Sequence, residues 1–267
     1  MTPKSIFFSI IILFICSCKS DFERIRTSGD AEKMFEIANE YFETEEYSKA
    51  ITLYEMIIPA YRGKSQAEEI AYRFAHSHYL SGRYILSSHY FKSFADTYTS
   101  SARKEEALYL SAISYYRLSP RYQLDQSESA KAIDAFQLFA NSYPESPKIE
   151  ECNTYIDELR KKMEEKAFES GKLYYNTRNY SSAIQSLENM LKDYPDSERS
   201  EEARYLIVKA SIDWADNSIY LRQEERYKKT IERCEAYLKR HAGAERAEDI
   251  VVFRDKCEQE LNTIQNG

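Results

Sequence analysis

The sequence repeats one short apolar pattern, and this repeat constrains the fold more than any other feature. Clear copies of Tyr-x-x-Ala/Ser end at Ala50, Ser87 and Ala183, and weaker copies place Ala132 and Thr230 in the same small position. Apolar or aromatic residues stand four and seven positions after each small residue. Positions zero, four and seven lie on one face of a helix. The pattern therefore predicts an amphipathic helix at each copy.

A second helix is expected before each of these helices. In three copies an aromatic pair stands nine residues before the small position, and a further small residue stands three positions earlier, at Ala38, Ala75 and Gly171. Small residues there let the two helices approach closely. A break comes twelve positions after the repeated small residue, as in Tyr143-Pro144 and Tyr194-Pro195. Proline ends the second helix because it cannot continue the backbone hydrogen bonds.

Helix–turn–helix units with a period near 34 residues are typical of tetratricopeptide repeats. Here the copies recur every 37 to 51 residues, because the chain has insertions near 120–129 and 216–225 and a long first helix over about 149–176. We expect an all-α, right-handed solenoid of about five tetratricopeptide-like helix pairs. A C-terminal helix over 247–263 is expected to cap it.

An acidic pair stands six and seven residues after each break, in the first turn of the next predicted helix. The pairs are Glu68-Glu69, Glu105-Glu106, Glu150-Glu151, Glu201-Glu202 and Glu248-Asp249. Negative charge at this end of a helix meets the positive end of the helix dipole, worth about 0.3–1 kcal/mol per exposed charge. We therefore interpret these carboxylates as structural and assign them no chemistry.

Composition supports a helical fold and excludes several classes of protein. The chain has only 6 glycines and 6 prolines in 267 residues, too few turn residues for a fold of many short strands. The glycines never cluster, so no phosphate-binding loop is expected. A net charge of −7 argues against a protein that neutralises nucleic-acid phosphates, and we expect no nucleic-acid partner.

The first residues indicate export and a lipid anchor. Residues 1–17 hold an apolar run over 6–15, about half the roughly 20 residues that a bilayer-spanning helix needs, which is typical of a signal peptide. The segment Ile15-Cys16-Ser17-Cys18 resembles a bacterial lipobox, and Cys18 is the expected lipidation site. Residues 18–29 would then be a lipidated polar tether. No Asp follows Cys18, and this favours the outer membrane over the inner membrane. We expect the periplasmic face. The alternative to a lipobox is a plain secretory signal whose two cysteines are coincidental.

Three further cysteines remain, Cys152, Cys234 and Cys257, and an odd number is no disulfide framework. Cys152 and Cys234 fall at predicted core positions, so we interpret them as small buried apolar residues. A Cys234–Cys257 bridge is the alternative.

No catalytic or metal centre is expected. His76 and His78 stand two apart on a predicted helix, so they point about 200° apart and cannot share a metal ion. The sequence contains no nucleophile-elbow, zinc-protease or phosphate-loop motif. We predict no enzyme activity, no cofactor and no metal.

The 23 tyrosines are the abundant chemical resource. Tyr72 and Tyr109 fall on first helices, one residue from a core position, and Arg73, His76 and Tyr116 lie near them. First helices line the concave face of such solenoids, and Tyr and Arg dominate binding hot spots. We predict that these five residues form a groove for an extended chain with aromatic residues and a terminal carboxylate. The alternative is that the tyrosines only cover contacts between repeats.

Four segments carry a family resemblance, together with the long helix, the two insertions and the lipobox. They are Leu124-Asp125-Gln126, Tyr143-Pro144-Glu145-Ser146-Pro147, Gly171-Lys172-Leu173-Tyr174-Tyr175 and Leu191-Lys192-Asp193-Tyr194-Pro195-Asp196-Ser197. With them the chain resembles the BamD family, lipoproteins of the outer-membrane β-barrel assembly machine, over about residues 30–265. The resemblance is sharpest over residues 103–209.

The resemblance implies a scaffold that helps to fold and insert β-barrel proteins. The N-terminal repeats, residues 30–146, would bind signals of unfolded β-barrel outer-membrane proteins. The C-terminal repeats and capping helix, residues 147–267, would dock on the POTRA domains of BamA. The residues expected to contact BamA are Tyr175, Arg178, Asn179, Lys192 and Asp193, with the turn that continues to Ser197.

Two other functions use similar chains. A lipoprotein that coordinates cell-wall synthesis or division with such repeats would commonly add an N-terminal coiled coil, and this sequence shows no such heptads. A surface glycan-binding lipoprotein would favour Trp-rich loops, whereas Trp214 is the only tryptophan.

Overall fold

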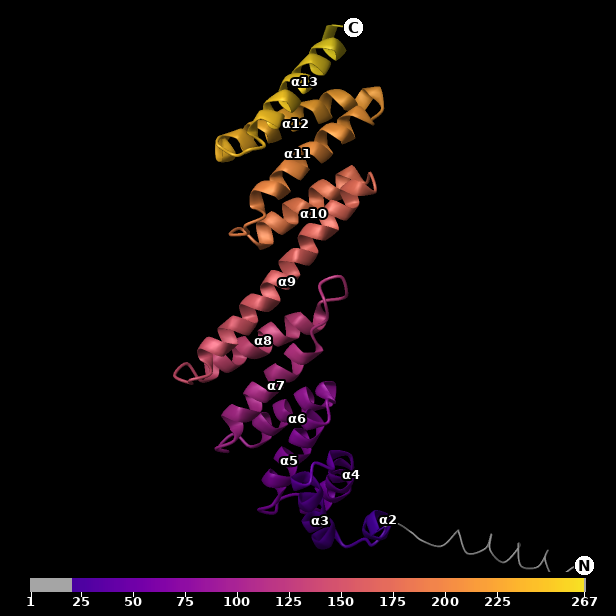
Figure 1. The fold of residues 1–267 in the computed structure, drawn as a ribbon, viewed down its shortest axis with the longest axis vertical. Coiled ribbons are helices and arrows are strands. Elements are labelled where there is room, and N and C mark those ends of the chain that lie inside the picture. The colour runs from indigo at the N-terminus through magenta and orange to yellow at the C-terminus, as the bar shows by residue number, and fades with distance from the viewer. Residues whose placement is uncertain (1–20, 267) are drawn as a thin grey trace, which may run out of the picture. The chain divides into compact units, whose positions relative to one another are not determined.

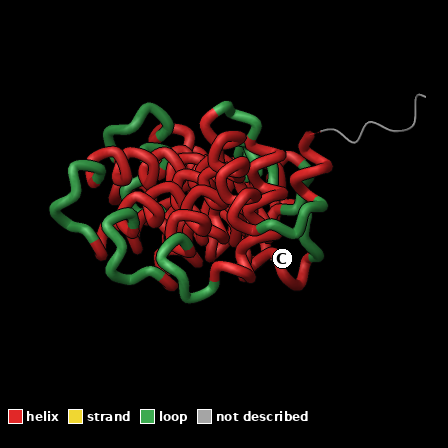
Figure 2. Tube along the Cα trace, turned by 90° about the horizontal axis from the view of Figure 1, so that it is seen from below, coloured by secondary structure: helices red, strands yellow, loops and turns green. Residues whose placement is uncertain are grey.

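A computed structural model describes residues 21–266, and within this range the chain consists of helices and their connecting loops, with no strand (Figure 2). In chain order the elements are α2 (Asp21–Arg26), α3 (Ala31–Glu43), α4 (Tyr47–Ile57), the 3₁₀ helix η1 (Ile58–Tyr61), α5 (Ala67–Leu80), α6 (Tyr84–Thr97), α7 (Lys104–Leu118), α8 (Ser127–Ser142), α9 (Ile149–Asn176), α10 (Tyr180–Asp193), α11 (Ser200–Asp216), α12 (Tyr220–His241) and α13 (Ala247–Asn266).

Successive helices pack against each other as pairs, α3 with α4, α5 with α6, α7 with α8 and α11 with α12 (Figure 1). In the remaining pair, Phe168 of α9 shares a buried cluster with Leu187 of α10. The last helix, α13, packs on α12 and extends slightly beyond its expected end. The predicted all-α architecture of tetratricopeptide-like helix pairs is confirmed.

The predicted register is also confirmed by burial. The repeated small residues Ala50, Ser87, Ala132, Ala183 and Thr230 are each 0% exposed. The residues four positions later are equally buried; they are Tyr54, Phe91, Phe136, Leu187 and Cys234. The small side chain therefore marks the closest approach of the paired helix, and the larger residue one turn later fills the space between them.

The chain divides into two compact units within α9. Among the described residues, the first unit contains 21–120 and 127–156, and the second contains 121–126 and 157–266. The short segment 121–126 belongs to the second unit because Lys166 Nζ donates to the Leu124 carbonyl at 2.6 Å. Sequence reasoning placed the division between residues 146 and 147, at the break before α9, because it treated each helix as part of one repeat.

Serines in the loops between repeats connect neighbouring units of the repeat, and we call each such loop a seam. In three seams the serine hydroxyl donates to a carboxylate of an earlier first helix, at 2.5 to 2.7 Å. The pairs are Ser101–Glu68, Ser146–Glu105 and Ser197–Glu164. Each serine also accepts from the backbone N–H two residues later. Glu68 and Glu105, which the sequence explained by the helix dipole, are thus also hydrogen-bond acceptors at the seams, whereas Glu164 lies in the middle of α9.

The N-terminal segment differs from the expected polar tether. Residues 21–26 form α2, and Phe22 packs edge-on against Tyr41 of α3 with ring centroids 5.9 Å apart. The Asp30 side chain then caps α3 by accepting from two backbone N–H groups. Amphipathic spacing of Phe22 and Ile25 explains the short helix. The expected signal peptide, residues 1–17, and the lipidation site Cys18 lie outside the described residues.

Helices of the described part of the chain are all too short or too polar to cross a bilayer. Cys152, Cys234 and Cys257 are buried free thiols. Burial raises the pKa of Cys152 to about 11 and that of Cys234 and Cys257 to about 12. The structure therefore shows these cysteines as apolar core residues, without the alternative bridge.

Candidate functional site

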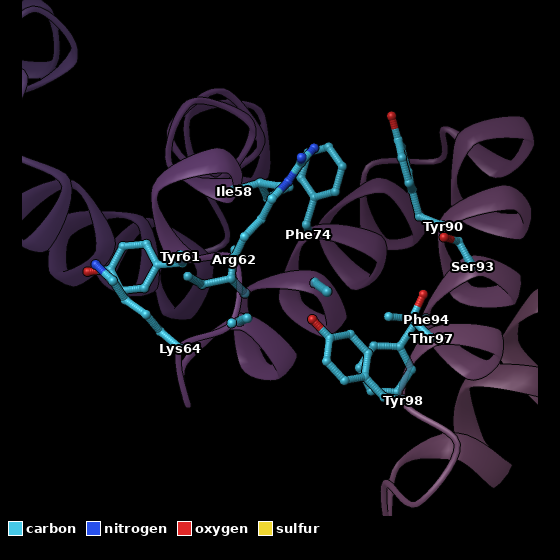
Figure 3. A pocket seen from close by; sticks show the side chains of 14 residues that line it. Ile58, Tyr61, Arg62, Lys64, Phe74, Tyr90, Ser93, Phe94, Thr97 and Tyr98 are labelled. Carbon is cyan, nitrogen blue, oxygen red and sulfur yellow. The ribbon is translucent and has the colours of Figure 1, made fainter.

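A cavity of about 580 Å³ opens in the first unit, between the loop that follows η1 and helices α5 and α6. Most of its wall is apolar or aromatic: Ile58, Tyr61, Ala67, Ile70, Ala71, Phe74, Tyr90, Phe94 and Tyr98, and the hydroxyl residues Ser93 and Thr97 also line it. Figure 3 shows Tyr61 on one side and Tyr90, Ser93 and Thr97 of α6 on the other. The exposed residues Arg62, Gly63 and Lys64 complete the lining. We call this the first-unit cavity.

Helix periodicity and one glycine build this cavity. The α5 residues that line it recur at the three- and four-residue spacing of one helix face, from Ala67 to Phe74. Gly63 has a φ of +79°, a left-handed conformation that favours glycine and turns the chain between Arg62 and Lys64. The turn leaves both cations at the exposed edge of an aromatic wall.

The edge of the cavity is positively charged. Lys64 Nζ lies 4.8 Å from the centre of the Tyr61 ring, a cation–π contact that still leaves its protons accessible. Within residues 21–266, neither Lys64 nor Arg62 has a carboxylate within 4.0 Å. An apolar cavity of this size with unpaired cations at its edge suits an apolar or aromatic group that ends in a negative charge.

A neutral histidine closes one end of the aromatic wall. His78 is 3% exposed and packs against Phe74 and Tyr90, with ring centroids 4.7 and 5.2 Å away. Neither ring nitrogen has a hydrogen-bond partner. Burial, aided by the charge of Arg83, lowers the pKa of His78 to about 4, so the ring adds no charge to the wall near neutral pH.

The structure places Tyr72, Arg73 and His76 about opposite the face of α5 that lines the cavity. Tyr72 is 7% exposed and contacts Phe91 and Phe94, while the Arg73 guanidinium binds Glu43 at 2.6 Å and Glu69 at 3.0 Å. His76 contacts Tyr72, and burial lowers its pKa. These side chains fill the contact between successive helix pairs, and the five expected groove residues do not gather on one open surface.

Tyr109 and Tyr116 lie in two other clusters of the first unit. Tyr109 is 8% exposed, contacts Phe139 and lies under Lys148 Nζ, 4.1 Å from its ring centre. Burial and the hydrogen-bonded carboxylate of Glu151 raise the pKa of Tyr109. Tyr116 is half-buried and packs against Tyr155, with ring centroids 4.4 Å apart. Tyr72 and Tyr109 therefore have little surface with which to meet a partner.

The residues expected to bind BamA lie at the two ends of α10. Arg178 and Asn179 are exposed in the turn before it, and Arg178 has a φ of +61°. Lys192 and Asp193 are exposed at its other end, about 20 Å away along a 14-residue helix. Tyr175 is half-buried, and its hydroxyl donates to Asp213 at 2.8 Å. One partner must span about the length of α10 to meet all five.

A polar hollow lies beside the second of these ends. Its volume is about 220 Å³, and it is lined by Asp157, Arg160, Lys161 and Glu164 of α9 and by Tyr194, Pro195, Asp196 and Ser197 of the following turn. Charges of both signs surround it, which suits a polar protein contact better than a small apolar ligand.

The described residues hold no group of three or more His, Cys, Asp or Glu side chains placed to bind a metal ion. The first-unit cavity was missed by sequence reasoning, which read Tyr61-Arg62-Gly63 only as the end of a helix. Two cations on either side of a glycine, at the end of an aromatic helix face, are the signal that marks it.

Comparisons with curated proteins agree with the sequence resemblance. BamD of Rickettsia prowazekii, an outer membrane protein assembly factor, is 22% identical over 75% of this chain and 80% of its own length. BamD of Pasteurella multocida is 21% identical over 73% of this chain and 77% of its own length. The solved TPR2AB domain of yeast Sti1, in its pHSP90 complex, has a TM-score of 0.38 at 14% identity and covers 85% of this chain and 98% of its own.

One family spans most of the chain. Its sequence model, YfiO, is described as an outer membrane lipoprotein and matches residues 27–212 and 161–256. These matches include every helix pair described above, the first-unit cavity and α10. The chain belongs to the YfiO family of outer membrane lipoproteins.

Proposed function

We propose that this chain is a lipid-anchored scaffold, on the periplasmic face of the outer membrane, that helps β-barrel proteins to fold and insert. It acts by binding and positioning, with no covalent step and no cofactor. The N-terminal repeats bind segments of unfolded barrel proteins, and the C-terminal repeats dock on the POTRA domains of BamA. The names of the two BamD relatives and the family match support this role.

The observation that carries the proposal is the first-unit cavity. An unfolded barrel protein presents extended chain with aromatic side chains and ends in a carboxylate. Aromatic walls formed by Tyr61, Phe74 and Tyr90 suit such side chains, and Arg62 and Lys64 suit the negative charge. The cluster around Tyr72 stays a prediction for a second contact with the same client, through the more accessible Arg73 and Tyr116.

A peptide titration tests the client half of the proposal. The full chain in detergent is titrated with a dye-labelled peptide of alternating polar and aromatic residues that ends in Phe with a free carboxylate. Fluorescence anisotropy gives the affinity. We expect Arg62→Gln combined with Lys64→Gln to weaken binding at least tenfold, because even one lost charge-assisted hydrogen bond costs about 1.5–3 kcal/mol and about 1.4 kcal/mol is tenfold in affinity.

Two controls distinguish binding that depends on the terminal carboxylate from nonspecific binding. The amidated peptide should bind wild type as weakly as the free peptide binds the double variant. Arg117→Gln removes an exposed cation of α7 outside the cavity and should leave binding unchanged. Equal affinity of the wild type for both peptides would show that the cavity does not read a carboxylate.

Affinity purification tests the BamA half. Tagged full-length chain is recovered from detergent-solubilised membranes, and co-purified BamA is quantified. Arg178→Glu and Lys192→Glu reverse the charge at either end of α10, and both should reduce the recovered BamA. Lys131→Glu, in the first unit, is the control. Recovery of cell-wall enzymes or glycan importers without BamA would contradict the proposal and favour one of the two alternative functions.

A further inference from the structure

A second cavity, of about 190 Å³, lies in the second unit among α10, α11 and α12. Apolar side chains form one part of its wall and charged side chains the other: Leu191, Ile207, Val208, Ala236 and Tyr237, with Glu188, Arg204 and Arg233. We call it the repeat-five hollow, because α11 and α12 are the fifth helix pair.

The two arginines of the hollow differ in their partners. Arg233 donates to the Glu188 carboxylate at 3.0 Å and to the Ser211 hydroxyl at 3.2 Å. Arg204 has no carboxylate within 4.0 Å among the described side chains, and its Nε is buried without a hydrogen-bond partner. A buried donor without an acceptor costs about 1–3 kcal/mol, and more when the group is charged.

The surroundings of Arg204 are also short of negative charge. Burial lowers the pKa of Arg204, and the positive charge of Arg240 on α12 lowers it further. The ring of His241 also has a buried nitrogen, Nε2, without a hydrogen-bond partner among the described residues. Glu201, three residues earlier on α11, already accepts from Tyr237 and Arg246. The one carboxylate in the wall of the hollow, Glu188, is paired with Arg233, so among the described residues the partly buried Arg204 has no carboxylate of its own within 4.0 Å.

The structure assigns the repeat-five hollow as a binding site for an Asp or Glu side chain of a protein partner, with Arg204 as the principal contact. A guanidinium presents parallel N–H donors that match a carboxylate, and the apolar wall receives the short stem of the side chain. The carboxylate of Glu188 in the same hollow disfavours a phosphate, which carries more negative charge. The assignment rests on the proposed function in that the C-terminal repeats are the part that docks on a partner.

Site-specific cross-linking tests the assignment. A photo-reactive benzoylphenylalanine replaces Ala236, an exposed residue of the wall, in the full-length chain expressed in cells. The adduct is mapped by mass spectrometry. We expect a cross-linked peptide that contains Asp or Glu, and a loss of about tenfold in adduct yield when Arg204→Gln is added. Arg222→Gln, which alters an exposed arginine at the other end of α12, should leave the yield unchanged.

The outcomes separate this site from the proposed function. An acidic peptide of a protein other than BamA, lost on Arg204→Gln, supports the hollow and contradicts docking on BamA. Cross-linking to BamA that is indifferent to Arg204→Gln overturns the hollow and leaves docking on BamA intact. A mapped peptide without acidic residues also overturns it.

Two further measurements exclude other roles of Arg204. Because Arg204 has no carboxylate within 4.0 Å among residues 21–266 and its Nε has no acceptor there, Arg204→Gln should keep or raise the thermal unfolding midpoint; a lower midpoint would make it a structural residue. Inorganic phosphate and sodium glutamate are then added to the cross-linking reaction in membranes at equal ionic strength. Glutamate should compete at least as well as phosphate, and stronger competition by phosphate would overturn the carboxylate assignment.

Discussion

Gly171 lies at a close contact between two helices of the second unit, α9 and α10. A Cβ placed on this residue would lie 2.5 Å from Leu187 Cγ and 2.6 Å from its Cδ2. Leu187 is 0% exposed and lies in the core that joins α9 to α10. In an open helix, alanine would be better than glycine by roughly 0.5–1 kcal/mol. Here the clash outweighs that gain, since overpacking a core costs about 1–3 kcal/mol.

We therefore predict that Gly171→Ala lowers the stability of the chain by about 1–2 kcal/mol. Urea unfolding followed by circular dichroism measures the change in midpoint. Gly243→Ala is the control, because a Cβ there meets nothing within 4 Å. Adding Leu187→Ala to Gly171→Ala should recover part of the loss caused by the clash; a double variant whose losses simply add would contradict this account.

His78 gives the chain a second residue-scale sensitivity, to acid. Its folded pKa is about 4, below the ordinary value of 6.5 that it regains on unfolding. The unfolded chain therefore binds the proton more readily, and stability falls as the pH drops from about 6.5 to about 4. A gap of this size corresponds to roughly 3 kcal/mol at full protonation of the unfolded form.

We predict that His78→Phe flattens the loss of stability between pH 6.5 and pH 4, because phenylalanine keeps the ring contacts and binds no proton. Urea midpoints at four pH values across this window give the slope. His89→Gln, at an exposed position of α6, should leave the slope as in the wild type. A slope unchanged by His78→Phe would mean that carboxylates alone set the acid sensitivity.

At the scale of elements, the seams show how successive repeats are fixed. In three seams a loop serine accepts from the backbone N–H two residues later and donates to a carboxylate of an earlier first helix. One hydroxyl therefore joins two consecutive repeats. The last seam has Ala244 in the serine position, and Glu201 there accepts from Tyr237 and Arg246 instead. At this seam the acceptor is still a glutamate of the first helix, but the donors are a tyrosine and an arginine instead of a serine.

We predict that Ser146→Ala destabilises the first unit by about 1–2 kcal/mol, because it leaves the partly buried Glu105 carboxylate without this donor. Ser142→Ala is the matched control, since its exposed hydroxyl bonds only the Leu138 carbonyl of its own helix. Thermal unfolding of both variants measures the difference. Equal midpoints would show that water replaces the seam bond at no loss.

Helix period made most of the fold predictable. Positions such as Ala50, Ser87 and Ala183 follow from spacing within one helix, and burial confirms them. The helix period identifies the residues that face the core, but it does not show which of the remaining faces an adjacent helix covers. Tyr72 is buried by Phe91 and Phe94 of the next helix, and Tyr109 by Phe139, contacts that depend on crossing angles. Both were expected on an open groove for this reason.

The candidate site was less predictable than the fold. The first-unit cavity depends on the left-handed turn at Gly63 and on the spacing between η1 and α6. The helix period of the sequence predicts neither of them. The same holds for the unpartnered Arg204, since a lack of partners is visible only when all neighbours are placed. The sequence motifs that resemble a family were informative about the repeats, and less so about residues in contact.

At the scale of the whole molecule, a lipid on Cys18 would hold the first unit at a membrane. We predict that Cys18→Ala abolishes palmitate labelling of the chain, because Cys18 is the expected lipidation site. Cys16→Ala should leave the chain in membranes, since bulky Ile15 would precede Cys16 at the cleavage site. Palmitate labelling with fractionation tests both; a Cys18→Ala chain that still carries the label would contradict lipidation at this residue.

Packing of α2 against α3 leaves only a short stretch of chain between the expected lipidation site and the folded first unit. Two residues, Lys19 and Ser20, separate Cys18 from Asp21, so their Cα atoms are at most about 11 Å apart. With an acyl chain on Cys18, the first helix pair would stay close to the lipid headgroups and could not move far from the membrane. An incoming barrel precursor would then meet its receptor where lipid begins, already beside the surface it must enter.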